Sequence, residues 1–175
     1  MTGSTYIDFD KATARGLKLI RTGENPNFGL LIICGINLGM RIGDLLTLTF
    51  KDLKSGTIIL VEQKTKKRRE LKVNDNIKSV LNHFNVSDNL YCFRTQKESV
   101  ISPQHVNRLL KKHFNKDTSS HSLRKTFGRR VWENNNCSEK ALTYLSELFN
   151  HATIKDTRTY LGIRQEELND IYDNL

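Results

Sequence analysis

The feature that most constrains the fold is a nearly uninterrupted apolar run close to the N-terminus, FGLLIICGINLG at residues 28–39. No position in it is charged, so a helix built from it has no polar face for water and must be surrounded by other elements. The run is too short for a membrane span, which needs ~20 apolar residues. We expect a buried helix at the centre of a globular domain, interrupted near Gly35 and Gly39 because glycine weakens helices.

The segments around this run show helical periods with recognisable N-terminal caps. In the helix of sequence HSLRKTFGRRVWEN, for example, Leu123, Phe127 and Val131 form one apolar stripe. The expected helices run from a cap at Asp8 or Asp10 to about Ile20, over 42–49, 77–84 and 104–114, from Ser119 or Ser120 to about 134, from Ser138 through Leu148, from Thr153 with Asp156 to about Gly162, and over 163–175.

The period changes once, between residues 57 and 73. TIILVEQ is apolar and β-branched, KTKK is a turn, and RRELKV alternates between apolar and polar positions. This pattern predicts an antiparallel hairpin, with room for a third short strand. The predicted fold class is therefore α+β, mainly α-helical with a small antiparallel β-sheet. Only two prolines and no linker-like segment interrupt the chain, so we expect a single domain over residues 1–175.

Positive charge is concentrated in the middle of the chain. Residues 61–131 carry 17 basic and 6 acidic side chains, whereas residues 132–175 carry 4 and 8. A basic middle with an acidic tail indicates a surface for a polyanion, although a solvated lysine-rich surface gives the same composition. No basic amphipathic helix with an aromatic face points to a membrane partner. The three widely separated cysteines indicate reduced thiols and a cytoplasmic location.

Several polar residues suggest chemistry, but each is a weak signal alone. His121 and Arg124 are neighbours at a helix N-terminus, which attracts anions. Arg41 stands between a glycine turn and an apolar helix, where Asp44 could pair with it or cap the backbone. Lys64 begins the hairpin turn. Taken alone, His121, Arg124 and Arg41 are better explained as surface residues than as parts of a site.

Signatures of other enzyme classes are missing from the sequence. It contains no P-loop, no H-E-x-x-H, no cysteine pair for zinc and no G-x-S-x-G. No acidic cluster suggests a two-metal nuclease. We expect no metal ion and no cofactor.

Taken in order, LGMRIGDLLTL, QKTKKRREL, HSLRKTF and LFNHATIKDTRTYLGI resemble the active-site boxes of the tyrosine recombinase (phage integrase) family. The resemblance covers residues 9–162 and corresponds to that family's catalytic domain. It implies two phosphate-clamping arginines, a hairpin lysine, two histidines, a tyrosine nucleophile and a supporting acidic residue. By position these are Arg41, Arg124, Lys64, His121, His151, Tyr160 and Asp44.

The implied activity is metal-independent cleavage and rejoining of double-stranded DNA through a 3′-phosphotyrosyl link. The basic residues Lys66, Lys67, Arg68 and Lys125 are candidates for DNA contacts. Two positions depart from the family pattern. Phe149-Asn150 replaces the common Leu-Gly before His151, and Gly43 stands where a polar residue is frequent.

Two alternatives remain open from sequence. A type IB topoisomerase uses the same chemistry to relax DNA, and a non-catalytic DNA-binding module would share the basic middle. The resemblance further implies a bacterial or phage-encoded, nucleoid-associated protein that forms a tetramer on DNA. In that assembly the segment 163–175, with Leu168, Ile171 and Leu175 on one side, docks on a neighbouring protomer. The N-terminal DNA-clamping domains of such enzymes are not contained in this chain.

Overall fold

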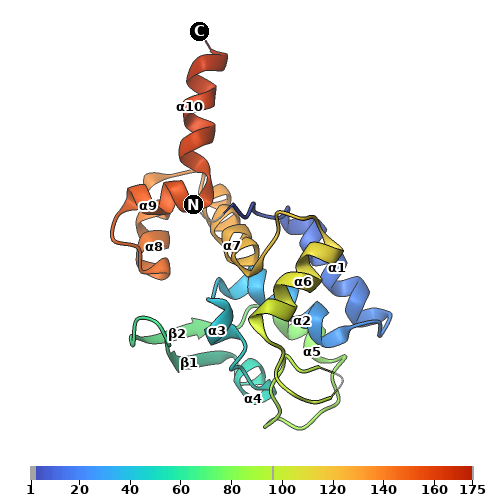
Figure 1. The fold of residues 1–175 in the computed structure, drawn as a ribbon. Helices are drawn as coiled ribbons and strands as arrows, with labels where there is room; N and C mark the ends of the chain where they lie inside the picture. Colours follow the sequence, from blue (N-terminus) through green and yellow to red (C-terminus); the bar gives the residue numbers. More distant parts are fainter. Residues whose placement is uncertain (1–2, 96, 175) are drawn as a thin grey trace.

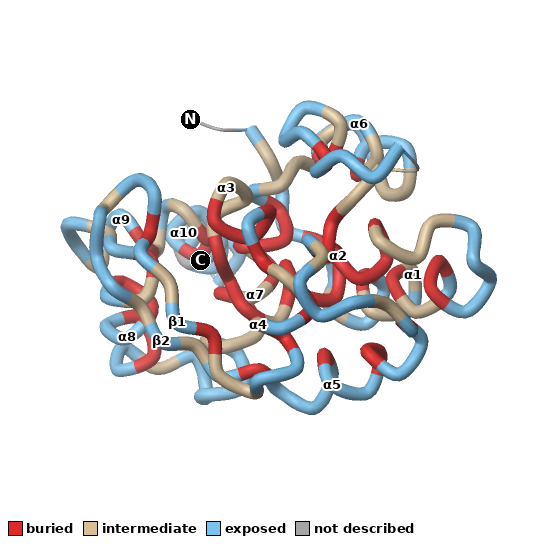
Figure 2. Tube along the Cα trace, turned by 90° about the horizontal axis from the view of Figure 1, so that it is seen from below, coloured by how far each residue is buried: buried red, intermediate tan, exposed pale blue. Residues whose placement is uncertain are grey.

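The apolar run forms the central helix of the domain. A computed structural model describes residues 3–95 and 97–174, apart from the side chain of residue 167. In it α2 (Pro26–Leu38) packs against α1 (Phe9–Arg21), α5 (Asp75–Leu81) and α7 (Ser120–Asn134). Residues 28–36 of α2 are all buried, and α2 lies among the other helices in Figures 1 and 2. No helix in the described part is long and apolar enough to cross a membrane.

The two glycines of this run behave differently. The predicted interruption at Gly35 is wrong, because α2 continues through it to Leu38. Gly35 is a packing position instead: a Cβ there would lie 2.7 Å from Cδ1 of Leu123 on α7. The interruption at Gly39 is confirmed. Gly39 ends α2 with a φ of +59° and turns the chain toward Arg41.

The remaining predicted helices are present with small shifts of their ends. Asp8, Ser119 and Ser138 cap helices as expected, and Thr153 with Asp156 forms a capping box. Gly162 ends the short helix in a left-handed conformation, also as expected. The helices not yet given are α6 (Pro103–His113), α8 (Glu139–Phe149), α9 (Ile154–Leu161) and α10 (Ile163–Asp173).

The segment predicted as one helix over 42–49 is two shorter helices. α3 (Ile42–Leu45) ends after one turn, and α4 (Phe50–Lys54) begins after Thr49. The Thr49 hydroxyl and the Asp52 carboxylate form a capping box that starts α4. The sequence prediction did not use this signal. Leu45, Leu46 and Leu48 of the segment are buried.

The hairpin is also confirmed. β1 (Thr57–Val61) pairs antiparallel with β2 (Arg68–Lys72), with Thr57 opposite Lys72 and Val61 opposite Arg68. Within the described residues the sheet has these two strands, and the possible third strand is replaced by isolated bridges at Thr49–Tyr91 and Arg94–Val100. The mainly helical α+β fold with a small antiparallel sheet is therefore confirmed.

Buried apolar side chains form two clusters. The larger one is built around α2 and includes the inner faces of α1, α4, α5 and α6. The smaller one contains Leu142, Leu145, Phe149, Leu161 and Ile163 and joins α8 and α9 to α7. Beyond the smaller cluster, α10 extends away from the domain (Figure 1). Its residues Leu168 and Ile171 are exposed, and Leu175 lies outside the described residues.

Replacing Gly39 by alanine should destabilise the fold strongly. A Cβ at Gly39 would lie 2.3 Å from Cδ1 of Phe127, in addition to the strain of its left-handed backbone. We expect Gly39→Ala to lower the free energy of unfolding by roughly 2–4 kcal/mol, as measured by urea denaturation.

Gly23→Ala is the matched control. Gly23 has a similar φ of +71° but nothing within 4 Å of its Cβ position. Only backbone strain applies there, so the expected loss is about 1 kcal/mol. Equal losses for the two variants would contradict the close packing of Gly39 against Phe127.

Candidate active site

The six residues that the family resemblance marks as catalytic line one cavity. Its volume is about 470 Å³, and it lies where α3, the hairpin loop, α7 and the α8–α9 segment meet. The sequence separates these residues by up to 119 positions, so their convergence is a product of the fold. They are Arg41, Lys64, His121, Arg124, His151 and Tyr160.

Arg41 enters the cavity from the turn that follows α2. It is the N-cap residue of α3 and has an extended backbone, with φ −68° and ψ 147°. Its Nη1 donates to Oε2 of Glu62 at 2.8 Å, and its Nη2 donates to the carbonyl oxygen of Phe149 at 3.0 Å. Arg41 does not pair with Asp44, which was one of the two possibilities raised by the sequence.

Arg124 approaches from the first turns of α7 and is 5% exposed. Its Nη1 donates to the carbonyl oxygen of Gly39 at 2.6 Å, and its Nη2 donates to that of Phe149 at 3.1 Å. The guanidinium carbon lies 4.2 Å from the centre of the Phe149 ring. Burial lowers the pKa of Arg124 to about 10, so the group remains charged at neutral pH.

The Phe149 carbonyl therefore accepts hydrogen bonds from both arginines. It is at the C-terminal end of α8, where helix carbonyls have no partner within the helix and the helix dipole is negative. Asn150 ends α8 in a left-handed conformation with φ 53°. Asparagine is the common non-glycine residue at such a position, so the departure from Leu-Gly keeps the turn before His151.

Glu62 is a residue of the site that sequence analysis missed. It is 2% exposed, and its carboxylate accepts from Arg41, from Nη1 of Arg69 at 2.8 Å and from the Thr65 hydroxyl at 2.6 Å. Burial alone would raise its pKa, but hydrogen bonds from Thr65, Arg69 and Arg41 and the charge of Arg41 lower it to about 2. Its position after a β-strand and before the basic turn carried no signal of its own.

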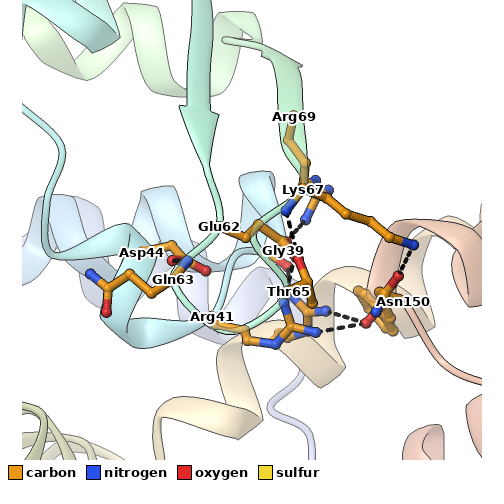
Figure 3. A network of polar contacts seen from close by, with 11 residues as sticks. Gly39, Arg41, Asp44, Glu62, Gln63, Thr65, Lys67, Arg69 and Asn150 are labelled. Carbon is orange, nitrogen blue, oxygen red and sulfur yellow. Dashed lines mark hydrogen bonds and ion pairs between the residues drawn. The ribbon is translucent and has the colours of Figure 1, made fainter.

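The loop between β1 and β2 is attached to the site on both sides (Figure 3). Buried Asp44 accepts a hydrogen bond from the backbone N–H of Gln63 at 2.8 Å. The supporting acidic residue therefore holds the hairpin loop. On the other side, Nζ of Lys67 donates to the side-chain oxygen of Asn150 at 2.6 Å. The second departure, Gly43, leaves space that the Gln63 side chain approaches. Lys64 lies between these attachments and is exposed at the cavity.

The two histidines contact the Tyr160 ring. The ring centroid of His151 lies 5.2 Å from that of Tyr160, and the centroid of His121 lies 6.4 Å from it. Burial, and then the nearby charge of Arg124, lowers the pKa of both histidines below the ordinary value. Both imidazoles are therefore neutral at neutral pH, and Nδ1 of His151 is 2.9 Å from the hydroxyl of Thr157.

Tyr160 lies on α9 with its hydroxyl 3.5 Å from the backbone carbonyl of His121. Within the described part of the chain the His121 ring makes no hydrogen bond to this hydroxyl. Burial raises the pKa of Tyr160 to about 12, although Arg124 and Arg41 oppose the shift. The phenol is therefore protonated in the absence of DNA.

The candidate DNA contacts differ in their availability. Lys66 and Arg68 are exposed on the hairpin, and Lys67 is exposed but engaged by Asn150. Lys125 is half-buried, with Nζ donating to the Ser4 carbonyl at 2.7 Å and lying 5.2 Å from the Tyr160 ring centre. Over residues 3–95 and 97–174 there is no group of three or more His, Cys, Asp or Glu side chains that could hold a metal ion.

Comparisons with known proteins find a matching family model and a similar sequence. The model of the Phage integrase family matches residues 30–167. A probable integrase/recombinase of Bacillus subtilis (strain 168), YoeC, is 28% identical over 157 residues, which cover 85% of this chain and 84% of that protein.

Two solved structures share the fold. The XerA recombinase matches 97% of this chain with a TM-score of 0.67 and 20% identity. The Tn1549 transposon integrase, solved in complex with circular intermediate DNA, matches 89% with a TM-score of 0.62 and 19% identity. This chain spans only 65% and 60% of the lengths of those two structures.

Glu62→Gln tests the buried carboxylate. Because the folded-state pKa of Glu62 is depressed, its contribution to stability is present above pH 4.5 and is lost as the pH falls toward 2. The shift corresponds to roughly 3 kcal/mol. We expect the variant to unfold at lower denaturant concentration at neutral pH and to lose less stability than the wild type on acidification.

Glu70→Gln is the control for this measurement. Glu70 is exposed on β2, two residues from the edge of the hairpin loop. It should leave both the midpoint and the pH profile nearly unchanged. A Glu62→Gln profile parallel to that of the wild type would show that the carboxylate does not stabilise the site.

Proposed function

Because the chain belongs to the phage integrase family of tyrosine recombinases, we propose that it cleaves and rejoins DNA strands by the attack of Tyr160 on a phosphodiester. The product of cleavage is a 3′-phosphotyrosyl link. The observation that carries the proposal is the single cavity lined by two arginines, two histidines, a lysine and a tyrosine. These are the groups that such a displacement needs: a nucleophile, positive charge for the phosphorane and proton carriers.

The arginines supply the charge. In the DNA-free protein each arginine donates two hydrogen bonds, Arg41 to Glu62 and the Phe149 carbonyl, and Arg124 to the carbonyls of Gly39 and Phe149. A phosphate entering the cavity offers charged oxygens, which accept stronger hydrogen bonds than a neutral carbonyl. Arg41 and Arg124 then hold its non-bridging oxygens, together with His151.

The covalent step needs two proton transfers. The hydroxyl oxygen of Tyr160 attacks phosphorus, and its proton passes to the neutral imidazole of His121. The bond from phosphorus to the 5′ oxygen breaks, and that oxygen takes a proton from the Lys64 ammonium. Rejoining reverses each step. A 5′ hydroxyl attacks the phosphorus of the phosphotyrosyl link and gives its proton to the Lys64 amine. The Tyr160 oxygen leaves and takes back the proton held by His121. The phosphotyrosyl bond conserves the energy of the broken link.

The resting state favours an inactive phenol. With a pKa of about 12, Tyr160 stays protonated until a phosphate and its base are in place. The base must also move closer, because the hydroxyl donates to the backbone carbonyl of His121, at 3.5 Å, and not to its ring. Movement of α9 toward the cavity would bring them together.

DNA is the proposed partner, with the basic hairpin and cavity as its contact surface. Lys66 and Arg68 are exposed there, and DNA phosphates can compete with Asn150 for Lys67. Lys125 is a weaker candidate than the sequence suggested, since Ser4 already accepts its hydrogen bond. We propose that residues 1–175 form the catalytic domain.

A nicked duplex tests the covalent step directly. A nick near the scissile phosphate releases a short strand on cleavage and so traps the protein on DNA. With a library of nicked duplexes of randomised sequence, we expect an adduct that survives denaturant and EDTA, and none with Tyr160→Phe. Lys64→Ala should form the adduct slowly. Its rate should recover on a substrate whose 5′ leaving group has a low pKa and so needs no proton.

The outcomes separate the alternatives. A non-catalytic DNA-binding module would bind the library with salt-sensitive affinity and leave no adduct in denaturant. A relaxing enzyme would form the adduct on many sequences and remove plasmid supercoils, whereas a recombinase would select a defined site. An undiminished adduct with Tyr160→Phe would overturn the assignment of the nucleophile.

We further propose that α10 docks on a second copy of this chain, as part of a tetramer on DNA. The helix contacts α9 of its own domain and carries exposed Leu168, Ile171 and Tyr172. Its base is fixed by the ion pair between Nη1 of Arg129 and Oε2 of Glu166, at 2.6 Å. A fixed helix with an uncovered apolar stripe is suited to an intermolecular contact.

Removal of the stripe should prevent assembly. We expect Leu168→Ser with Ile171→Ser to sediment on DNA as a smaller complex than the wild type. These side chains are exposed, so the stability of the isolated domain should stay within about 0.5 kcal/mol. Deleting residues 163–175 is a less specific test, because it also removes Glu166, the ion-pair partner of Arg129. Unchanged assembly in the double variant would refute the docking role of α10.

A further inference from the structure

The Thr157 hydroxyl occupies an unusual place beside the cavity. Thr157 is in the middle of α9, is fully buried, and is one helical turn before Tyr160. Its Oγ1 lies 2.9 Å from Nδ1 of His151, six residues earlier in the chain. Across the described residues this is the only hydrogen bond that the hydroxyl makes.

The direction of this hydrogen bond follows from what the two groups can offer. A hydroxyl is a donor that needs an acceptor when it is buried away from water. Within the described chain the acceptor in reach is Nδ1 of His151. The hydroxyl therefore donates and Nδ1 carries no proton. A neutral imidazole has one N–H, so its proton must be on Nε2.

We infer that Thr157 is a positioning residue that holds His151 in the Nε2–H tautomer, with this N–H available to a phosphate oxygen in the cavity. The inference rests on the proposed function, because it assigns His151 the part of a donor to the scissile phosphate. In the opposite tautomer Nε2 would present a lone pair to a negatively charged oxygen. That contact is repulsive, and it would remove one of the donors that stabilise the phosphorane.

The charged surroundings of His151 make the tautomer important. The charged groups that act on His151 are Arg124 of α7, Arg41 before α3 and Asp156 of α9, and the Tyr160 ring also faces it. Burial comes first among the causes that lower the pKa of His151, and Arg124 comes next. An imidazolium would donate from both nitrogens whatever its partner. A neutral ring donates from one nitrogen only, so its partner at Nδ1 decides which nitrogen that is.

Thr157 also links the histidine to the nucleophile. The two residues are three positions apart on one helix, so they lie on the same face of α9. A movement of α9 that advances Tyr160 therefore carries the partner of His151 with it. This coupling keeps the position of His151 relative to Tyr160 during the attack.

The test compares Thr157→Val, which removes the hydroxyl and nearly keeps the shape, with Thr157→Ser, which keeps the hydroxyl. Proton–nitrogen NMR of histidine-labelled full chain distinguishes a protonated from an unprotonated ring nitrogen, and His151→Asn identifies the His151 signals. At about pH 8, where the imidazole is neutral, we expect Nε2–H in the wild type and in Thr157→Ser. Thr157→Val should show a mixture of tautomers or Nδ1–H.

Cleavage of the nicked duplex supplies the second readout. Thr157→Val should form the phosphotyrosyl adduct about tenfold more slowly, the factor that corresponds to one lost hydrogen bond. Thr157→Ser should restore the rate to within about threefold of the wild type, because it retains that hydrogen bond. Urea unfolding of both variants shows whether a slow rate comes from loss of the fold.

The results separate this inference from the proposed function. The role of Thr157 would be overturned by a proton on Nδ1 of His151 in the wild type. It would also be overturned if folded Thr157→Val kept both the wild-type tautomer and the wild-type cleavage rate. In either case an adduct at Tyr160 would leave the proposed function intact. No adduct from the wild type, together with the expected tautomers, would instead count against the function. If Thr157→Val does not fold, the wild-type tautomer still decides the inference.

Discussion

The structure of the site depends on holding two positively charged guanidinium groups side by side. Arg41 and Arg124 repel each other, and Arg124 is almost entirely buried. Three groups offset this cost: the Phe149 carbonyl that both arginines share, the Gly39 carbonyl, and the buried Glu62 carboxylate. The shared carbonyl is at the negative end of α8, so the helix dipole acts on both cations at once. The protein thereby holds the positive charge in place at the cavity.

This arrangement lies between the two hydrophobic clusters of the domain. Arg41 and the hairpin belong to the side built around α2, whereas Phe149, His151 and Tyr160 belong to the side of α8 and α9. The helix α7 contributes to both clusters and carries His121 and Arg124 at its start. Bonds from the arginines to Phe149 and from Lys67 to Asn150 cross the boundary. Any relative movement of the two sides therefore changes the distance between Tyr160 and the two arginines.

The parts of the fold that could be predicted are those with a local cause. A cap such as Ser119 or Thr153 acts within one turn of its helix, and the alternation of the hairpin is visible over a few residues. Predictions failed where packing decided the outcome. Gly35 does not break α2, because the Leu123 side chain packs closely beside it. The start of α4 was missed for a different reason: its cause is local, the capping box of Thr49 and Asp52, but it lies inside an apolar segment. Lys125 stays a candidate DNA contact, and only the structure shows that its Nζ donates to the Ser4 carbonyl.

The sequence by itself determined the helical α+β class, the main elements and, through four short boxes, the six residues whose side chains now line one cavity. Those boxes are recognisable because each is a contiguous pattern of residue types. Only the tertiary structure decided what holds the six in place. The partners of the arginines are 21, 85 and 108 residues from them along the chain, and two of those partners are backbone carbonyls. Every residue has such a carbonyl, so its use as an acceptor leaves no mark in the sequence and arises only when the chain brings it into reach.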